Sequence, residues 1–214
     1  MTRVAILISG NGTNLQAFID AVARGSLDIH LAVVLSNQPD AFGLVRAADA
    51  GIPTECIQNA DYADRESFDQ AMIDVLEQHR VDLVVLAGFM RILSNVFVRH
   101  FEGRVLNIHP ALLPKYPGLN THQRAIEAGE RWHGSTVHFV TEELDGGPRI
   151  LQGRVTVLSD DTASLLSARV QAVEHKIYPR AAALFASGRI EFKDGDTWLD
   201  GARLDEPVQW ENET

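Results

Sequence analysis

The feature that most constrains the fold of this chain is an alternation of continuous apolar runs with stretches in which apolar residues recur at helical spacing. Val4–Ile8 is continuously apolar, and Leu31–Leu35 and Leu83–Ala87 repeat the pattern. Such runs are typical of parallel strands covered on both faces. Helical spacing fills the intervals, for example in the stretch after Asp64, a residue suited to cap a helix. The alternation continues to about residue 110 and predicts an α/β fold with a doubly wound, mostly parallel sheet.

The pattern changes after residue 110. A proline-rich loop leads to predicted strands at 136–140 and 150–157 and then to a long helix, which Pro179 should kink or restart. The tail carries Lys193-Asp194-Gly195, a typical hairpin turn, which predicts an antiparallel C-terminal extension. We expect one domain, with a first half at 1–103, a second half at 104–188, and a hairpin and tail at 189–214.

Composition excludes several classes of protein. The chain has 214 residues, 45% of them hydrophobic, and a formal charge of −10. This acidity, with no basic run, argues against a nucleic-acid partner. The single cysteine, Cys56, cannot form an internal disulfide and is expected to be a small buried residue. No apolar run reaches the length of a membrane span, so we expect a cytoplasmic protein without membrane association.

Ser9-Gly10-Asn11-Gly12-Thr13-Asn14 follows the first strand and precedes a helix. A glycine-rich turn at a helix N-terminus suits an anion, because the helix dipole and backbone amides point at it and glycine permits close approach. The third glycine of the dinucleotide fingerprint is missing, and no P-loop lysine follows. The loop therefore predicts a site for a mononucleotide or sugar phosphate, although a plain tight turn with an asparagine cap remains an alternative.

Asn107 and His109 stand on a short strand that ends at Pro110. Side chains alternate along a strand, so the two polar groups share one face, and the ends of such strands line the ligand crevice of open α/β sheets. Asn107 can donate a hydrogen bond, and His109 can carry a proton near neutral pH. Alternatively, both side chains simply bond to loop backbone.

The remaining polar groups indicate less by themselves. Asp145 lies in a glycine-flanked loop, where a carboxylate is either held in place or solvated. His133 and His138 have no Cys, Asp or Glu at a zinc-binding spacing, so we expect no metal site. A structural role is the expectation for His138.

Four segments together resemble the folate-dependent formyltransferases: Ile8–Leu15, Ala87–Leu93, Asn107–Pro110 and Leu144–Gly147. Their order and spacing agree with the family over roughly residues 3 to 185. The Gly-Asn-Gly-Thr-Asn loop and the compact length are most similar to members that formylate phosphoribosylglycinamide. The resemblance implies a Rossmann-like formyltransferase fold.

It also implies substrates and residue roles. The donor would be 10-formyltetrahydrofolate, and the acceptor would be the amine of 5′-phosphoribosylglycinamide, in de novo purine synthesis. Asn107 and His109 would stabilise the oxyanion, while Asp145 would assist proton transfer, by holding His109 charged or through a water. The resemblance places the phosphate on Gly12, Thr13 and Asn14, the sugar at Glu174 (otherwise a solvated helix position), and the folate at Arg65, Met90, Arg91, Ile92, Leu93 and Asn107.

The sequence leaves three other functions as alternatives to this formyl transfer. A formyltetrahydrofolate hydrolase uses the same three catalytic residues with water as acceptor, but usually carries an N-terminal regulatory domain, for which the first strand at Val4 leaves no room. A transfer-RNA formyltransferase would need a further C-terminal domain and a basic surface. A non-catalytic nucleotide-binding module would not need Asn107, His109 and Asp145 together. We expect small-molecule substrates only, and a monomer or weak homodimer.

Overall fold

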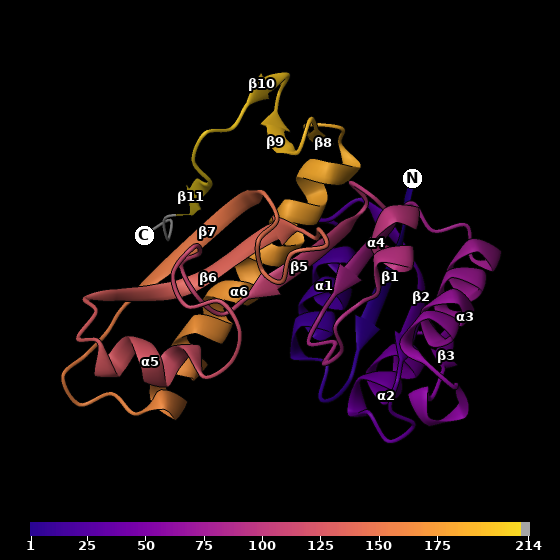
Figure 1. Ribbon diagram of the computed structural model, residues 1–214, viewed down its shortest axis with the longest axis horizontal. Helices are drawn as coiled ribbons and strands as arrows, with labels where there is room; N and C mark the ends of the chain where they lie inside the picture. The colour runs from indigo at the N-terminus through magenta and orange to yellow at the C-terminus, as the bar shows by residue number, and fades with distance from the viewer. Residues whose placement is uncertain (211–214) are drawn as a thin grey trace. The chain divides into compact units, whose positions relative to one another are not determined.

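The computed structural model describes residues 1–210 (Figure 1). The chain forms two compact units, of which the first is Met1–Asn107 and the second begins at Ile108. The strand β5 (Val105–His109) contributes residues to both units. Over the described residues, no helix combines the length and the apolar character that a membrane crossing requires.

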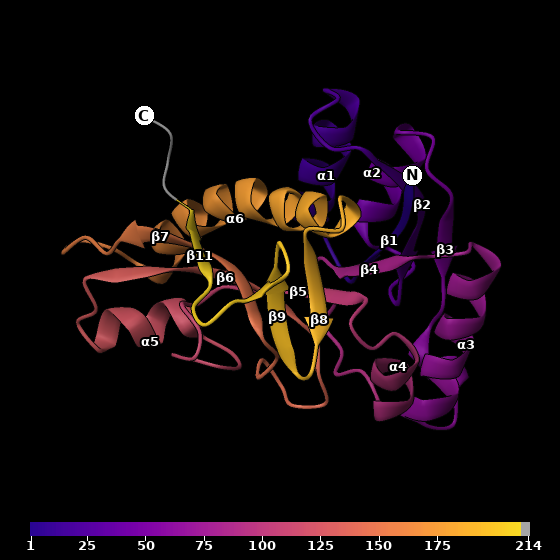
Figure 2. The ribbon, with the colours of Figure 1, turned by 90° about the horizontal axis from the view of Figure 1, so that it is seen from above.

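The first unit is an open parallel sheet with the strand order β3-β2-β1-β4-β5. Helices lie on both of its faces, with α1 and α2 on one side and α3 and α4 on the other (Figure 2). This is the doubly wound arrangement predicted from the alternation of strands and helices. The elements are β1 (Thr2–Ile8), α1 (Thr13–Ala23), β2 (Ile29–Ser36), α2 (Phe42–Asp49), β3 (Thr54–Cys56), the 3-10 helix η1 (Asn59–Asp61), α3 (Arg65–Gln78), β4 (Leu83–Leu86) and α4 (Asn95–His100).

Local sequence explains why these elements form. Val4–Ile8 is entirely buried, as expected for a strand covered on both faces. Asp64 caps α3 as predicted, because its carboxylate accepts the amide of Ser67 at 2.7 Å in a capping box. The prediction that Cys56 is buried was wrong: β3 is the edge strand of the sheet, and the thiol is exposed there.

The second unit continues from β5 in the order β5-β6-β7-β11. Strands β6 and β7 are antiparallel, β11 pairs parallel with β7, and α6 lies along one face of β6 and β7 (Figure 2). A separate antiparallel sheet, β8-β9-β10, forms the C-terminal extension that the sequence predicted. The elements are α5 (Thr121–Glu127), β6 (Trp132–Phe139), β7 (Arg149–Thr156), α6 (Ala163–Ala186), β8 (Ile190–Lys193), β9 (Asp196–Leu199), β10 (Ala202–Arg203) and β11 (Val208–Trp210).

Two turn and helix predictions in this unit had different outcomes. Asp194 and Gly195 join β8 to β9 with φ values of 54° and 82°, so the predicted hairpin turn is confirmed. Pro179 was predicted to kink or restart the long helix, and of these two effects the restart was wrong, because α6 continues through this proline. Pro179 is buried in α6, and the packing of that helix on β6 and β7 keeps it helical despite the missing amide.

Candidate active site

The end of β5 places the two polar groups predicted there. Leu106 and Ile108 are buried in the core, whereas Asn107 is half-buried and His109 is 6% exposed. Asn107 is paired with Leu86 of β4, and the strand ends at Pro110, which has no amide to continue the ladder. The regular strand therefore presents Asn107 and His109 on the same face.

Asp145 lies against His109. Its Oδ2 atom is 3.4 Å from Nδ1 of the ring, and both side chains are 7% exposed. The backbone amide of Gly118 donates to the same carboxylate oxygen at 2.9 Å. Asp145 has a φ of 53°, a left-handed conformation that aspartate tolerates better than most residues. The structure thus brings together two residues that the sequence placed in separate motifs, and Asp145 is held rather than solvated.

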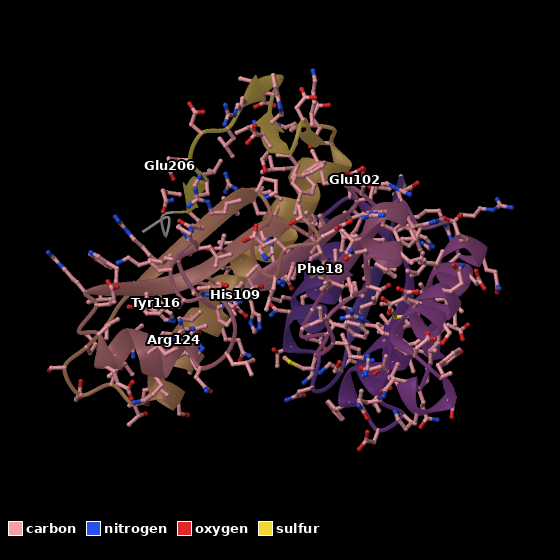
Figure 3. The ribbon with its side chains drawn as sticks, viewed as in Figure 1. Phe18, Glu102, His109, Tyr116, Arg124 and Glu206 are labelled. Atoms are coloured by element: carbon pink, nitrogen blue, oxygen red, sulfur yellow. The ribbon has the colours of Figure 1, made fainter. Side chains whose placement is uncertain are left out.

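The second nitrogen of the His109 ring meets a backbone carbonyl. Nε2 is 2.8 Å from the carbonyl oxygen of Tyr116. Figure 3 labels both residues among the side chains of the protein. This carbonyl can only accept a hydrogen bond, and an ionised Asp145 likewise can only accept. An imidazolium ring, with a proton on each nitrogen, satisfies both neighbours at once.

His138 is a further member of this cluster. The side chain is 2% exposed, its Nδ1 lies 2.8 Å from the carbonyl oxygen of Phe139, and its Nε2 lies 4.0 Å from Oδ1 of Asp145. Burial lowers the pKa of His138, although the hydrogen bond to Phe139 and the charge of Asp145 act in the opposite direction. Burial thus disfavours the charged form of His138, which lies beside Asp145. The sequence predicted only a structural role, because the proximity to Asp145 depends on the fold.

Glu174 reaches the same region from α6. It is 8% exposed, so it is not a solvated helix position. The hydroxyl of Ser135 lies 3.0 Å from Oε1 of Glu174 and 2.8 Å from the carbonyl oxygen of His109. Ser135 was not singled out from the sequence, yet it links Glu174 to the backbone of the candidate catalytic histidine.

The glycine-rich loop of the first unit has the geometry of a close-packed turn. Gly12 is the N-cap of α1 with a φ of 71°, so the alternative of an asparagine side-chain cap was wrong. A Cβ atom at Gly12 would lie 2.8 Å from Cα of Gly43. Arg46 holds the loop, because its Nε donates to the carbonyl oxygen of Asn11 at 2.8 Å and its Nη2 to Oδ1 of the same residue at 3.0 Å. A cation thus stands beside the predicted phosphate loop, which the sequence did not indicate.

The segment Met90–Leu93 begins at the end of β4 in the same unit. Met90 is 75% exposed and Ile92 is 60% exposed, an unusual pair of open apolar side chains. The Met90 amide donates to the hydroxyl of Ser9 at 2.8 Å, and this hydroxyl donates to Oδ1 of Asn37 at 2.6 Å. Ser9 therefore joins the start of this segment to the end of β1.

Two arginines predicted to line the folate site share one buried carboxylate. Burial raises the pKa of Asp69, while the hydrogen bond from the Ser94 amide and the charges of Arg65 and Arg91 act to lower it. The guanidinium of Arg91 also stacks over the ring of Phe68, with 4.9 Å between its carbon and the ring centroid. Within residues 1–210, no group of three or more His, Cys, Asp or Glu side chains is arranged to hold a metal ion.

Comparison with known proteins identifies the class of this protein as a formyl transferase. The family model described as "Formyl transferase" matches residues 2–182, and the chain belongs to this family. Among its relatives, the phosphoribosylglycinamide formyltransferase of Escherichia coli is 52% identical over 94% of this chain and 95% of its own length. The human trifunctional purine biosynthetic protein adenosine-3 is 49% identical over 88% of this chain, which corresponds to 19% of that longer protein.

Solved structures agree with this assignment. The phosphoribosylglycinamide formyltransferase of Coxiella burnetii is similar with a TM-score of 0.94 and 46% identity, over 98% of this chain and 99% of that one. The glycinamide ribonucleotide transformylase 1 of Symbiobacterium toebii gives a TM-score of 0.90 and 45% identity, over 93% of this chain and 94% of that one. The expected fold class is therefore confirmed.

Proposed function

We propose that this chain transfers the formyl group of 10-formyltetrahydrofolate to the amine of 5′-phosphoribosylglycinamide, a step of de novo purine synthesis that also yields tetrahydrofolate. The observation that carries the proposal is the buried contact between His109 and Asp145, with Asn107 two residues earlier on the same strand. The names of the E. coli and C. burnetii relatives support it.

The proposal assigns binding roles to the remaining site residues. The glycine-rich loop and the N-terminus of α1 would bind the acceptor phosphate, and the buried Glu174 would bind the sugar. The exposed apolar side chains Met90 and Ile92 suit the flat ring system of the folate. In full, the assignment gives the phosphate to Gly12, Thr13 and Asn14, the sugar to Glu174, and the folate to Arg65, Met90, Arg91, Ile92, Leu93 and Asn107.

The three catalytic residues meet the needs of formyl transfer. The folate supplies the formyl carbon that the acceptor amine attacks, and negative charge develops on the formyl oxygen. The Asn107 amide and a charged His109 can both donate to that oxygen, a contribution of about 3 kcal/mol per donor in comparable sites. Asp145 stabilises the imidazolium and can take the proton that the amine loses, directly or through a water. The bond between the folate nitrogen and the formyl carbon then breaks, and this nitrogen gains a proton to give tetrahydrofolate. No covalent enzyme intermediate and no metal ion are needed.

A direct assay separates this proposal from a hydrolase. Purified protein is mixed with 10-formyltetrahydrofolate with and without phosphoribosylglycinamide. Loss of the formyl group that depends on the acceptor, together with the N-formyl product, is the expected outcome. Deformylation at the same rate without acceptor would establish the hydrolase instead, and no reaction would leave a binding module.

The proposal extends to the organisation of the protein. We propose that the chain acts in the cytoplasm on small molecules only, as a monomer or weak homodimer. Residues 1–103 would hold the phosphate and contribute Arg65 and Met90–Leu93 to the folate site, 104–188 would provide the catalytic residues and Glu174, and 189–214 would form a hairpin and tail. Sedimentation at several protein concentrations measures the oligomeric state.

A further inference from the structure

The C-terminal strand β11 adds to the edge of the sheet in the second unit. It lies beyond residues 2–182, which the family model matches. Its three residues pair parallel with β7, so that Val208, Gln209 and Trp210 stand beside Leu151, Gln152 and Gly153. Hydrogen bonds connect this strand to the backbone around the proposed active site.

Gln152 is the first connection. Its side chain is 7% exposed, and its amide group is fully engaged. Nε2 donates to the carbonyl oxygen of Leu113 at 2.8 Å and to Oγ1 of Thr136 at 2.9 Å, and Oε1 accepts from Nε2 of Gln209 at 3.3 Å. The Leu113 carbonyl oxygen and Thr136 Oγ1 both accept from the NH2 group, so this group must face them and the Gln152 carbonyl oxygen must face Gln209. These contacts fix the orientation of the side-chain amide.

The peptide groups of Leu113 are held by three side chains. The Leu113 amide donates to Oγ1 of Thr136 at 3.1 Å, and its carbonyl oxygen accepts from Nη1 of Arg149 at 3.0 Å as well as from Gln152. Thr136 in turn donates to the carbonyl oxygen of Ala111 at 2.7 Å. All three side chains come from β6 or β7. The sheet therefore fixes the backbone that follows β5, the strand that carries Asn107 and His109.

A bulge in β7 lets both donors reach the same carbonyl. In the ladder, Val137 is paired with Leu151 and His138 with Arg149, so Ile150 has no partner across the strand. Such a bulge re-aims the side chain that precedes it. Arg149 is also 3.8 Å from Glu206, which precedes β11, although this ion pair is exposed and therefore weak.

The backbone that Leu113 anchors makes the contacts of the proposed catalytic pair. The carbonyl oxygen of Tyr116 meets Nε2 of His109, and the amide of Gly118 donates to Asp145. A displacement of the segment from Ala111 to Gly118 would therefore change both contacts together. Misplacement of a catalytic group by about 1 Å can cost about a hundredfold in rate.

We propose that Gln152 is a positioning residue for formyl transfer, and that Gln209 of β11 orients it, so that the C-terminal strand supports the geometry of His109 and Asp145. This inference rests on the proposed function, because it takes those two residues as the catalytic pair. The C-terminal strand then supports the active site through Gln152. Loss of this support should lower kcat and leave the affinity for each substrate unchanged.

The experiment uses the full-length chain with Gln152→Met, Gln209→Ala and both together. Turnover, the KM for each substrate, the melting temperature and the stoichiometry of tetrahydrofolate binding are measured. We expect Gln152→Met to lower kcat about tenfold while each KM changes less than about twofold, since transition-state geometry is affected more than binding. Gln209→Ala should lower kcat about threefold in the wild type and have no further effect in the Gln152→Met background, because coupled residues are non-additive.

Controls separate positioning from simple destabilisation. Gln78, exposed at the end of α3, receives the same two substitutions and should leave every quantity unchanged. Turnover is expressed per folate-binding site, so a loss of folded protein does not lower it. Wild-type kcat per site in Gln152→Met would overturn the positioning role, and an equal effect of Gln209→Ala in both backgrounds would overturn the link through Gln152. Gln209 is exposed, so Gln209→Ala alone tests the inference where Gln152→Met folds poorly, and an unchanged kcat in that single variant would overturn the role of β11.

The proposed function can fail separately. If the wild type releases formate without an acceptor, the transferase proposal is wrong, but the same comparison of variants on the hydrolysis rate still tests the positioning role. If acceptor-dependent transfer is present and Gln152→Met matches its control, the proposed function stands and only the inference fails.

Discussion

The carboxylate of Asp145 lies 3.4 Å from Nδ1 of His109, with both side chains almost entirely withdrawn from solvent. The opposite ring nitrogen of His109 faces the Tyr116 carbonyl. An imidazolium at this position can donate a hydrogen bond to each neighbour. One of its N–H groups can instead donate to a substrate oxygen that becomes negatively charged. The pair therefore couples charge stabilisation to proton transfer in one small volume.

Removal of either partner should abolish most of the activity while the fold survives. We expect His109→Ala and Asp145→Asn each to lower kcat by about a hundredfold or more, as for the loss of an oxyanion donor. Steady-state kinetics and circular dichroism measure the two effects. His100→Ala, which removes an exposed histidine paired with Glu77, is the control and should keep normal turnover. Turnover near the wild-type level in either site variant would rule out this mechanism.

Gly12→Ala should damage the proposed phosphate-binding loop in two ways. Alanine at a φ of 71° costs about 1 kcal/mol, and the new Cβ atom would approach Cα of Gly43 to 2.8 Å. We expect a loss of about 2 kcal/mol in unfolding free energy and a raised KM for the phosphorylated acceptor. Urea unfolding and steady-state kinetics measure these effects.

Gly25→Ala is the matched control for this substitution. Gly25 has the same φ of 71°, and a Cβ atom there would have no neighbour within 4 Å. It should show the backbone cost alone, with both KM values unchanged. Equal stability losses in the two variants would show that the contact with Gly43 relaxes freely.

Sequence patterns predicted the elements because periodicity and caps are local. The apolar run of β1 and the Asp64 cap of α3 needed no tertiary information. The predicted strand at 136–140 began too late, because β6 starts at Trp132. The residues from Trp132 to Ser135 include polar side chains, which are expected in solvent and not inside a buried strand. His133 and Ser135 are buried there because His122, Glu174 and the His109 backbone provide partners from elsewhere in the chain.

The candidate site was predictable only in part for the same reason. Asn107, His109 and Asp145 stand in recognisable motifs, so they could be named from the sequence. Ser135, Arg46 and Gln152 stand in no motif, and their contacts exist only once distant segments meet. The burial of Glu174 likewise follows from the packing of α6 on β6 and β7.

Ser9→Ala should weaken the binding of the folate donor. The Ser9 hydroxyl accepts a hydrogen bond from the Met90 amide and donates one to Asn37. Without this hydroxyl, the start of the segment Met90–Leu93 loses its connection to the end of β1. One neutral hydrogen bond is worth about 1 kcal/mol, which corresponds to about a fivefold rise in the KM for the folate donor. Ser26→Ala, which removes a hydroxyl bonded to the carbonyl oxygen of Ala21, is the control. A rise in this KM by the same factor in both variants would contradict a specific role for Ser9.

The buried side chain of His133, which lies against His122, should make stability fall in mild acid. Burial, and then the charge of His122, lower the pKa of His133 to about 4, from an ordinary value of 6.5. The unfolded chain therefore binds a proton that the folded chain excludes, and stability falls as the pH drops from about 6.5 to about 4, by about 2 to 3 kcal/mol for this group. Urea unfolding across this pH range measures the slope. His133→Gln should flatten the slope, His30→Gln at an exposed site of β2 should not, and identical slopes in all three proteins would show that His133 does not contribute.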